Sequence, residues 1–387
     1  MIGMSAVIFI PDDTAKTGYP QPLMLQSVMG APLLAWLANA LFDSGVGRFF
    51  LVCHDRYVEA ARACLPAEAE VMTTMDSDPA DLLHVFLSTA EDAEHTITVV
   101  TGPAVYLPQL APQAAGRFPR VYGVSREELM QALDEHFSFA RFLLDNGSPM
   151  NEEQAMYSVA SPAELPEIAG LLQRNRLLAL ARTGVEIYDA SSCYVEPAVR
   201  VAPGARLLPG TMLRGKTVIG EEAVIGPWSV IDDSVIGARA VVNASQVRDS
   251  RVGQDAVVGP YASVRGGCEL GRSVRAGSFV ELKNARLGEN TQVPHLAYLG
   301  DTEAGANCNF GCGVATANFD RVQKHETVVG EGAFIGCNTA LIAPLQVGSG
   351  AYIGAGSTIT EDVPAQALGI ARARQSNKKE WAAKHKK

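Results

Sequence analysis

The sequence predicts a protein of two parts, an α/β domain followed by a parallel β-helix built from hexapeptide repeats. In the first part, short apolar runs rich in β-branched residues alternate with segments of helical periodicity. From about Tyr188 onward, an aliphatic residue followed by glycine recurs at steps that are mostly six or near twelve residues, which is the signature of a hexapeptide β-helix. A chain of 387 residues has the length for two such domains.

The first part alternates buried strands with helices. The expected strands are Ser5–Ile10, Arg48–Cys53 and Thr96–Thr101. The expected helices are Ala31–Phe42, Tyr57–Cys64 and Asp78–Thr89. This alternation predicts a parallel sheet with helices on its faces. Ligands of such sheets bind beyond the carboxyl ends of the strands, so the segments of interest are the loop Pro11–Pro22 and the segment Gly102–Tyr106.

Two further helices are expected before the repeats. Ser125–Leu144 is amphipathic, with apolar residues near helical spacing. A longer helix begins with Ser161 as N-cap and Pro162 at the first helical position, and it continues to Gly184. The expected domains are an α/β domain over 1–160, a linker helix over 161–187, the β-helix over 188–372 and a basic tail over 373–387.

The repeats have a simple physical basis. The aliphatic residue fills the narrow interior, and glycine is expected to allow the turn at each corner. Successive coils stack at strand spacing, about 4.8 Å. The pairs are Ile219-Gly220, Ile225-Gly226, Ile236-Gly237, Val252-Gly253, Val258-Gly259, Leu270-Gly271, Leu287-Gly288, Leu299-Gly300, Val329-Gly330, Ile335-Gly336, Val347-Gly348 and Ile353-Gly354. The one long break, from Gly311 to Val329, is expected to be an inserted loop.

The stretch from Gly288 to Val329 places polar, titratable residues among these repeats. A repeat array normally excludes such residues from its regular coils, so their presence indicates a site. A histidine in the middle of a chain is usually a surface or a satisfied core residue. His295, however, shares this short window with Tyr298, Asn309, Asn318 and Lys324. The functional interpretation of the window is therefore preferred.

Composition narrows the class of partner. The formal net charge of -10 argues against nucleic acid as the partner of the main body, although the tail from Arg372 onward is basic. No apolar run approaches the length of a membrane span, and the start of the chain lacks the basic region of a signal peptide. The 7 cysteines are scattered, so reduced thiols in the cytoplasm are expected, with no metal site.

The repeat array with its polar interruption resembles the acetyltransferase half of the bacterial bifunctional N-acetylglucosamine-1-phosphate uridyltransferase/glucosamine-1-phosphate acetyltransferase family. The resemblance covers roughly Val195–Trp381. Its specific pieces are Gly259–Arg265, Phe279–Gly288, His295–Asp301, Asn309–Gly313, Ala317–Asp320 and the end from Ala367 to Trp381. The resemblance implies a left-handed parallel β-helix, a hand opposite to that of ordinary parallel crossovers. It also implies a homotrimer with sites between subunits.

The resemblance implies a role for each matching position. His295 is the expected general base, taking a proton from the attacking amine. The residues expected to bind the amino-sugar phosphate are Arg265, Lys283, Tyr298, Asn309 and Lys324. The residues expected to contact the co-substrate acetyl-CoA are Cys312, Asn318, Phe319, Cys337, Ala355 and Arg372. Two of these depart from the family, which usually has Tyr in place of Phe319 and Ser in place of Cys337.

Elementary chemistry agrees with these roles. An ammonium group cannot attack a thioester, so the reaction needs a base with a pKa near neutrality, and histidine is the usual choice. A phosphate monoester is bound through charge-assisted hydrogen bonds from Arg and Lys. Arg265, Lys283 and Lys324 are far apart in the sequence, but the stacking of coils offers a way to bring them together.

The first domain resembles the sugar-nucleotide pyrophosphorylase (nucleotidyltransferase) domain of the same family in outline only. Glycines and an Arg that bind phosphates there are missing from Pro11–Pro22, and Gln21 stands where a Lys is usual. Pro103 replaces the Asp that binds Mg²⁺. Loss of uridyltransferase activity, and with it of Mg²⁺, is therefore expected.

The expected function is acetyl-CoA-dependent N-acetylation of glucosamine 1-phosphate, feeding UDP-N-acetylglucosamine and cell-envelope synthesis. Three alternatives stay open. In the first, the acceptor is another amino sugar or sugar nucleotide. In the second, the chain is still bifunctional, with metal ligands moved to Asp12 or Asp13. In the third, the chain is a non-catalytic trimeric scaffold. The intact His295, Lys283 and Lys324 argue against the scaffold.

Overall fold

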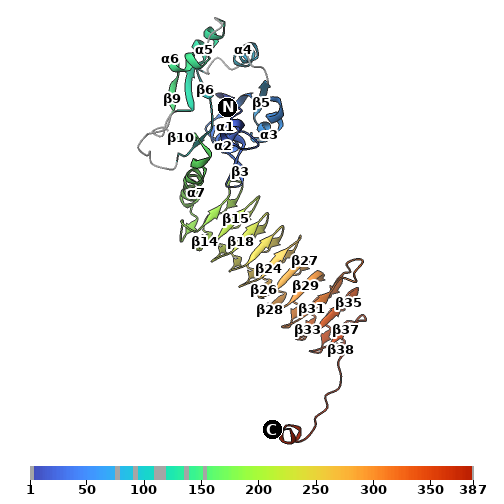
Figure 1. Ribbon diagram of the computed structural model, residues 1–387. Helices are drawn as coiled ribbons and strands as arrows, with labels where there is room; N and C mark the ends of the chain where they lie inside the picture. The colour runs from blue at the N-terminus through green and yellow to red at the C-terminus, as the bar shows by residue number, and fades with distance from the viewer. Residues whose placement is uncertain are drawn as a thin grey trace. The chain divides into compact units, whose positions relative to one another are not determined.

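The computed structural model describes residues 4–74, 79–89, 95–108, 119–134, 139–150 and 155–385. The chain divides into two compact units, Met1–Ala179 and Leu180–Lys387, which are traced in Figure 1. The division falls within the helix α7, Leu165–Arg182, which is preceded by a short 3-10 turn at Pro162–Glu164. The long helix expected from Ser161 onward is therefore present.

The first unit is built on a six-stranded sheet with the order β5-β4-β1-β6-β8-β9. The strands are β1 (Met4–Phe9), β4 (Val46–Val52), β5 (Glu70–Thr74), β6 (Thr96–Val100), β8 (Val121–Ser125) and β9 (Ser148–Met150). Strands β5, β4, β1 and β6 are parallel, as expected. Strands β8 and β9, which are not among the expected strands, extend this sheet with antiparallel pairing. Antiparallel neighbours need no helical crossover, and the β–α alternation does not reveal them.

Helices cover both faces of this sheet. They are α2 (Leu33–Asp43), α3 (Val58–Arg62), α4 (Ala80–Ser88), α5 (Arg126–Asp134) and α6 (Phe139–Asn146). Successive side chains of β4 point to opposite faces, so Phe49 packs with α2 and α3 while Phe50 packs with α4, α5 and α6. The helix expected over Ser125–Leu144 is found as α5 and α6, and residues 135–138 between them lie outside the described residues.

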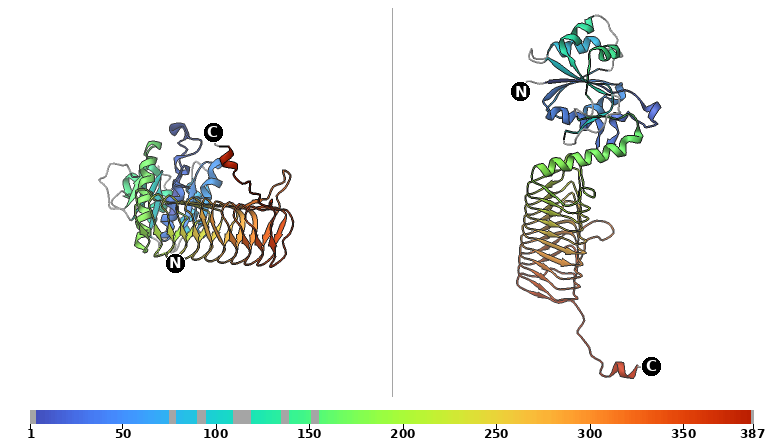
Figure 2. Two further views of the ribbon diagram at one scale, coloured as in Figure 1. Left: turned by 90° about the horizontal axis from the view of Figure 1, so that it is seen from below. Right: turned by 90° about the vertical axis from the view of Figure 1, so that its left-hand side faces the viewer.

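The second unit is a left-handed parallel β-helix, so the predicted fold class is confirmed for both units. Its short strands form an 11-stranded and a 17-stranded sheet in which each coil pairs with the next, and Figure 2 shows the stack of coils. Aliphatic side chains point inward in register. One such column contains Val242, Val258, Ala276 and Val293, all with no exposed surface.

Most of the repeat glycines serve close stacking rather than a special backbone conformation. A Cβ added to Gly237 would lie 2.6 Å from the amide nitrogen of Gln254, and one on Gly288 would lie 2.5 Å from that of Ala306. Neither glycine has a positive φ. The left-handed conformation falls instead on later corner residues, such as Asp255 with φ 58°. The expected reason for the repeat glycines is therefore wrong at these corners, because coil spacing, not chain reversal, excludes a side chain there.

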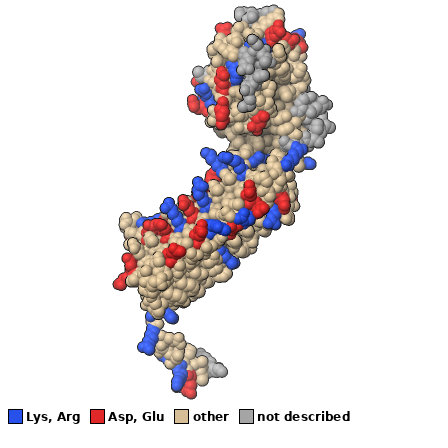
Figure 3. All heavy atoms as spheres, turned by 180° about the vertical axis from the view of Figure 1, so that it is seen from behind, with Lys and Arg blue, Asp and Glu red and all other residues tan. Residues whose placement is uncertain are grey.

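Charged side chains of both signs alternate along the outside of the coils, as one face in Figure 3 shows. One outward column in register contains Arg251, Glu269, Arg286 and Glu303. Opposite charges on directly paired strands stabilise the pairing. A shift by one coil would place like charges together, so the column favours a single stacking register.

The insertion in the β-helix is shorter than expected. Strands β31 (Ala315–Ala317) and β32 (Thr327–Val329) both continue the 17-stranded sheet. Only residues 318–326 leave the regular coil, so the prediction of a break from Gly311 to Val329 is wrong in its first part. The chain then ends in an exposed tail with the short helix α8, Trp381–Lys384. No helix among the described residues is long and apolar enough to cross a membrane.

Candidate active site

Coil stacking brings two of the expected acceptor-binding cations side by side. Arg265 ends strand β24 (Ser263–Arg265), and Lys283 lies in β27 (Glu281–Leu287). The two residues are direct partners in the parallel pairing of these strands. Both therefore occupy the same outward position on adjacent coils, about 4.8 Å apart along the helix axis.

A third cation reaches this pair from the insertion. The Lys324 side chain lies close to that of Lys283, and its proximity, followed by the charge of Arg265, lowers the pKa of Lys283. Asp301 opposes the shift with its negative charge. Like charges at this distance disfavour each other. An anion placed among the three side chains would relieve the repulsion and receive charge-assisted hydrogen bonds.

Arg265 already has one anionic partner within the chain. Its guanidinium donates to the carboxylate of Glu281, with which it forms an ion pair. A guanidinium carries five N–H donors, so this contact leaves donors for a ligand. Glu281 is in register with Tyr298 on the next coil, and this row runs beside the row that contains Arg265, Lys283 and Gly300.

Gly300 leaves a gap beside the cations. The sequence did not indicate this glycine as part of a site. It is the register partner of Lys283 in β29 (Tyr298–Ala304). A Cβ at this position would lie 2.4 Å from the hydroxyl oxygen of Tyr298 and 2.7 Å from the amide nitrogen of Asn318. The missing side chain therefore lets both polar groups pack over the coil next to Lys283. The only sequence signal for this role is a glycine in the outward row that contains Arg265 and Lys283.

Asp301 holds the base of the insertion in place. Its carboxylate accepts a hydrogen bond from Asn284 at 2.6 Å and another from Asn318. Asn318 is buried, and its amide reaches both Asp301 and the neighbourhood of Tyr298. The structure thus places Asn318, expected as an acetyl-CoA contact, beside Asp301 and Tyr298. Asp301 was not among the predicted site residues.

The expected base stands in one column with three of the expected acetyl-CoA contacts. His295 ends β28 (Gln292–His295), just before a corner of the β-helix. The corner hydrogen bonds are from Gly313 N–H to Leu296 O, from Asn338 N–H to Cys312 O and from Gly356 N–H to Cys337 O, each at 2.8 Å. In this register, successive coils present His295, Cys312, Cys337 and Ala355. The side chain of Arg372 approaches the same corner, with its Cδ 3.9 Å from a Cβ built on Gly356.

The imidazole of His295 is exposed. Among the hydrogen bonds and ion pairs of the described residues, none involves this ring. A general base needs an available lone pair, and the ring has one. Asn309 begins β30 (Asn309–Phe310) in the same sheet, one coil further on. Phe319 is exposed in the insertion, where its backbone bridges to Lys324.

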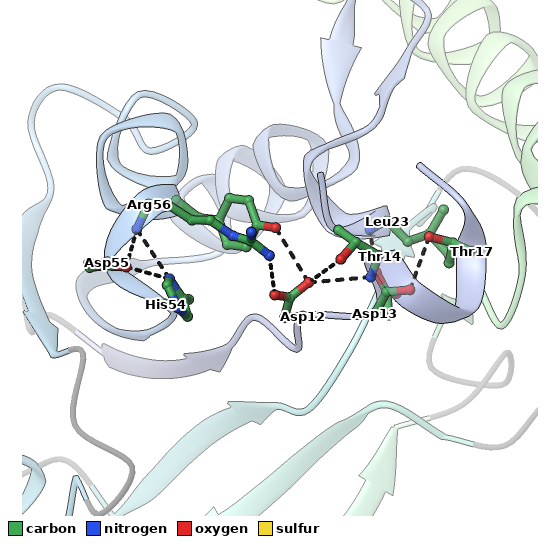
Figure 4. A network of polar contacts seen from close by, with 9 residues as sticks. Asp12, Asp13, Thr14, Thr17, Leu23, His54, Asp55 and Arg56 are labelled. Carbon is green, nitrogen blue, oxygen red and sulfur yellow. Dashed lines mark hydrogen bonds and ion pairs between the residues drawn. The ribbon is translucent and has the colours of Figure 1, made fainter. Parts of the chain in front are cut away.

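The first unit has a second polar cluster at the carboxyl ends of β1 and β4, which Figure 4 shows from close by. Asp12 accepts a hydrogen bond from the Thr14 hydroxyl at 2.7 Å and forms an ion pair with Arg56. The Thr14 hydrogen bond is the main cause that lowers the pKa of Asp12. Asp13 accepts a hydrogen bond from the Leu23 amide at 3.0 Å. The expected loop Pro11–Pro22 therefore contains a helical turn, α1 (Thr14–Thr17), that is held by its own carboxylates.

The segment after β6 is likewise covered by contacts within the chain. Gly102 lies beneath the side chain of Arg120, whose Cδ would be 3.2 Å from a Cβ on this glycine. Pro103 accepts a hydrogen bond from Val159 through its carbonyl, and β7 (Ala104–Tyr106) pairs with β10 (Met156–Ser158). In the parts of the chain that the structure describes, no group of three or more His, Cys, Asp or Glu side chains is placed to hold a metal ion.

Comparison with known proteins agrees with this architecture. Residues 326–361 match the family model "Bacterial transferase hexapeptide (six repeats)", so the fold and this match define a hexapeptide-repeat protein. The chain is 42% identical over 240 residues to the bifunctional protein GlmU of Clostridium perfringens, covering 62% of this chain and 53% of that protein. It is 45% identical over 221 residues to the bifunctional protein GlmU of Brevibacillus brevis, covering 57% of this chain and 48% of that protein. The chain is GlmU-like.

The chain spans about half the length of the GlmU proteins that it matches. Among solved structures, a UDP-N-acetylglucosamine acyltransferase from Arabidopsis superposes with a TM-score of 0.31 at 18% sequence identity, covering 49% of this chain and 66% of that chain. A similarity this low indicates no function for the chain.

Proposed function

We propose that this chain is an acetyl-CoA-dependent N-acetyltransferase whose acceptor is glucosamine 1-phosphate or a closely related amino-sugar phosphate. The observation that carries the proposal is the meeting of Arg265, Lys283 and Lys324 beside the Tyr298 hydroxyl. Such a cluster suits a doubly charged phosphate monoester, which accepts several charge-assisted hydrogen bonds. The proposed catalytic domain is the β-helix over residues 188–372, followed by the basic tail.

In the proposed reaction His295 acts as general base. It removes a proton from the amino group of the acceptor, and the nitrogen lone pair attacks the carbonyl carbon of acetyl-CoA. The C–S bond of the thioester then breaks, so that the acetyl group is left on nitrogen and the sulfur leaves as the thiolate of CoA, which takes up a proton. Positioned proton transfer of this kind contributes about 10²–10⁴-fold to the rate. The exposed imidazole, with no partner among the described contacts, supports this role.

The column below His295 supports a path for acetyl-CoA. Cys312, Cys337 and Ala355 follow His295 on successive coils, and Arg372 approaches the far end. A thioester lying along these small side chains would bring its acetyl end to the histidine and its phosphates toward the basic tail. On the acceptor side, Asn309 and Tyr298 are proposed to contact the sugar.

The first unit is proposed to lack uridyltransferase activity and a catalytic Mg²⁺. Nucleotidyl transfer depends on groups placed to neutralise the charge of the phosphates. Both oxygens of the Asp12 carboxylate already have partners in Thr14 and Arg56. One carboxylate oxygen of Asp13 accepts a hydrogen bond from the Leu23 amide. These contacts argue against the alternative in which the metal ligands have moved to Asp12 or Asp13.

A homotrimer in the cytoplasm is proposed as the working form. Four large apolar residues stand exposed along one corner of the β-helix: Trp228, Tyr261, Phe279 and Leu296. The rings of Tyr261 and Phe279 stack with their centroids 5.3 Å apart. An exposed group of large apolar side chains of this kind supports a protein interface at this corner. Light scattering at micromolar concentration tests the trimer, which a monomer mass would reject.

The decisive experiment for the reaction is thiol release from acetyl-CoA with a panel of acceptors. The panel contains glucosamine 1-phosphate, glucosamine, galactosamine 1-phosphate and a UDP-linked amino sugar. Fast release with glucosamine 1-phosphate alone supports the proposal. Preference for another member would reassign the acceptor, and no release with any member would favour the non-catalytic scaffold.

A further inference from the structure

The insertion that carries Lys324 is a small hairpin with a defined shape. Phe319 and Lys324 form an antiparallel bridge. The amide of His325 donates to the carbonyl of Asn318 at 2.8 Å, which closes the base of the hairpin. Lys324 is therefore flanked on both sides by residues whose backbone is paired across the loop.

Asp320 organises the tip and the side of this hairpin at once. One carboxylate oxygen accepts hydrogen bonds from the amides of Val322 at 2.7 Å and Gln323 at 2.8 Å. The other oxygen meets the Nε2 atom of His325 at 2.8 Å. The His325 contact is the largest cause of a lowered pKa at Asp320, followed by the two amide contacts. A single side chain thus joins the turn to the residue that directly follows Lys324.

Electrostatic repulsion from Lys283 and Arg265 opposes the position that Lys324 takes on the hairpin. Lys324 lies close enough to Lys283 to lower the pKa of that lysine, and Arg265 adds a third positive charge. Without a fixed loop, repulsion and the conformational freedom of a lysine side chain would both move Lys324 away. Holding the ammonium in place before the acceptor arrives reduces the ordering cost of binding.

We propose that Asp320 and His325 are positioning residues that hold Lys324 against Lys283 at the subsite for the phosphate of the acceptor. They act through Lys324 and do not themselves touch the phosphate. The inference rests on the proposed function for its substrate, but the position of Lys324 is open to a measurement that needs no substrate.

The first test is a double-mutant cycle of Asp320→Ala, Lys324→Ala and the double variant, assayed with glucosamine 1-phosphate. Asp320→Ala should raise KM for this acceptor about tenfold, as expected for the loss of a charged hydrogen bond, and leave kcat and the KM for acetyl-CoA within about twofold. In the Lys324→Ala background, Asp320→Ala should add nothing further. Full additivity of the two effects on KM, or an unchanged KM in Asp320→Ala, would overturn the proposal.

Matched variants separate positioning from general damage to the loop. His325→Gln keeps an N–H donor for Asp320 and should retain the low KM, whereas His325→Ala should behave like Asp320→Ala. Gln323→Ala alters an exposed side chain of the same loop tip and should leave KM unchanged. Equal loss in His325→Gln and Gln323→Ala would indicate unspecific disturbance and contradict the assignment.

The second test reads the position of Lys324 with no acceptor present. Competitive labelling of lysines with acetic anhydride across pH, followed by mass spectrometry, measures the pKa of Lys283. In Asp320→Ala the pKa of Lys283 should rise toward its ordinary value, as it should in Lys324→Ala. An unchanged pKa in Asp320→Ala would disprove the positioning role even if glucosamine 1-phosphate proved not to be the acceptor. A raised pKa without any turnover would instead retain the positioning role and reject the proposed reaction.

Discussion

Lys283, on a regular coil, and Lys324, on the inserted hairpin, bring two ammonium groups close together, and this proximity lowers the pKa of Lys283. Two ammonium groups in such a position raise the free energy of the unliganded protein. The repulsion disappears when an anion binds between them. The contact is therefore better explained as preparation for a negatively charged ligand than as a source of stability.

Replacement of His295 tests the base. His295→Ala should lower kcat for acetyl transfer by about 10²–10⁴-fold, because the amine loses its proton acceptor. Binding of acetyl-CoA, measured by calorimetry, should persist. His54→Ala, which alters an exposed histidine of the first unit, is the matched control and should leave kcat unchanged. A similar kcat in His295→Ala and the wild-type protein would remove the histidine from the reaction.

Replacement of Lys283 tests the phosphate subsite. Lys283→Ala should weaken binding of glucosamine 1-phosphate by about 1.5–3 kcal/mol, the range for a hydrogen bond to a charged group. The effect on unphosphorylated glucosamine should be small. Lys216→Ala, at another exposed lysine of the β-helix, serves as the control. Equal losses for the phosphorylated and unphosphorylated sugars would show that Lys283 does not bind the phosphate.

Replacement of Gly300 tests the gap beside the cations. In Gly300→Ala the new methyl group would lie 2.4 Å from the Tyr298 hydroxyl, so Tyr298 and Asn318 must move. The expected result is a higher KM for the acceptor and a loss of stability of about 1–3 kcal/mol, typical of overpacking. Gly170→Ala is the control, because a Cβ there meets nothing within 4 Å and the exposed helical site should gain stability. An unaltered acceptor KM in Gly300→Ala would contradict the role of the gap.

Uridyl transfer should be absent. The protein is incubated with UTP, Mg²⁺ and N-acetylglucosamine 1-phosphate, and pyrophosphate is measured over time. No release above background is expected, because Asp12 is bound to Thr14 and Arg56 and Pro103 offers no side-chain ligand. Clear turnover that Asp12→Ala abolishes would restore a bifunctional enzyme.

Acid should open the hairpin of residues 318–325 through Asp320. The pKa of Asp320 is lowered by His325 and by the amides of Gln323 and Val322, so the carboxylate stabilises the hairpin at pH values above the ordinary Asp pKa of about 3.9. This contribution is lost as the pH falls from there through the lower pKa of the folded state. Hydrogen exchange at the Val322 and Gln323 amides should accelerate in that window relative to neighbouring coils. The acceleration should be absent in Asp320→Asn, and its persistence there would assign it to another group.

The sequence by itself determined the architecture and pointed to the region of the candidate site. Hexad spacing leaves a narrow interior that only inward aliphatic residues can fill, so a β-helix follows from residues such as Ile219, Val258 and Ile353. The β–α alternation likewise predicts β1, β4 and β6 with their covering helices. Polar and titratable residues gathered between Gly288 and Val329 indicated the candidate site, because so many seldom share one short window of a repeat array. These properties depend on local pattern, which a sequence displays directly.

Only the tertiary structure decided how the residues of the candidate site are brought together. The column from His295 to Ala355 and the pairing of Arg265 with Lys283 depend on which residue stacks on which. Insertions and uneven repeats shift that register by amounts that spacing does not reveal. Three further features also required coordinates. They are the gap at Gly300, the hydrogen bond between Asp301 and Asn318, and the contact between Asp320 and His325 in the hairpin. Each is a side-chain contact whose geometry is set by the packing of coils, and no local pattern in the sequence encodes it.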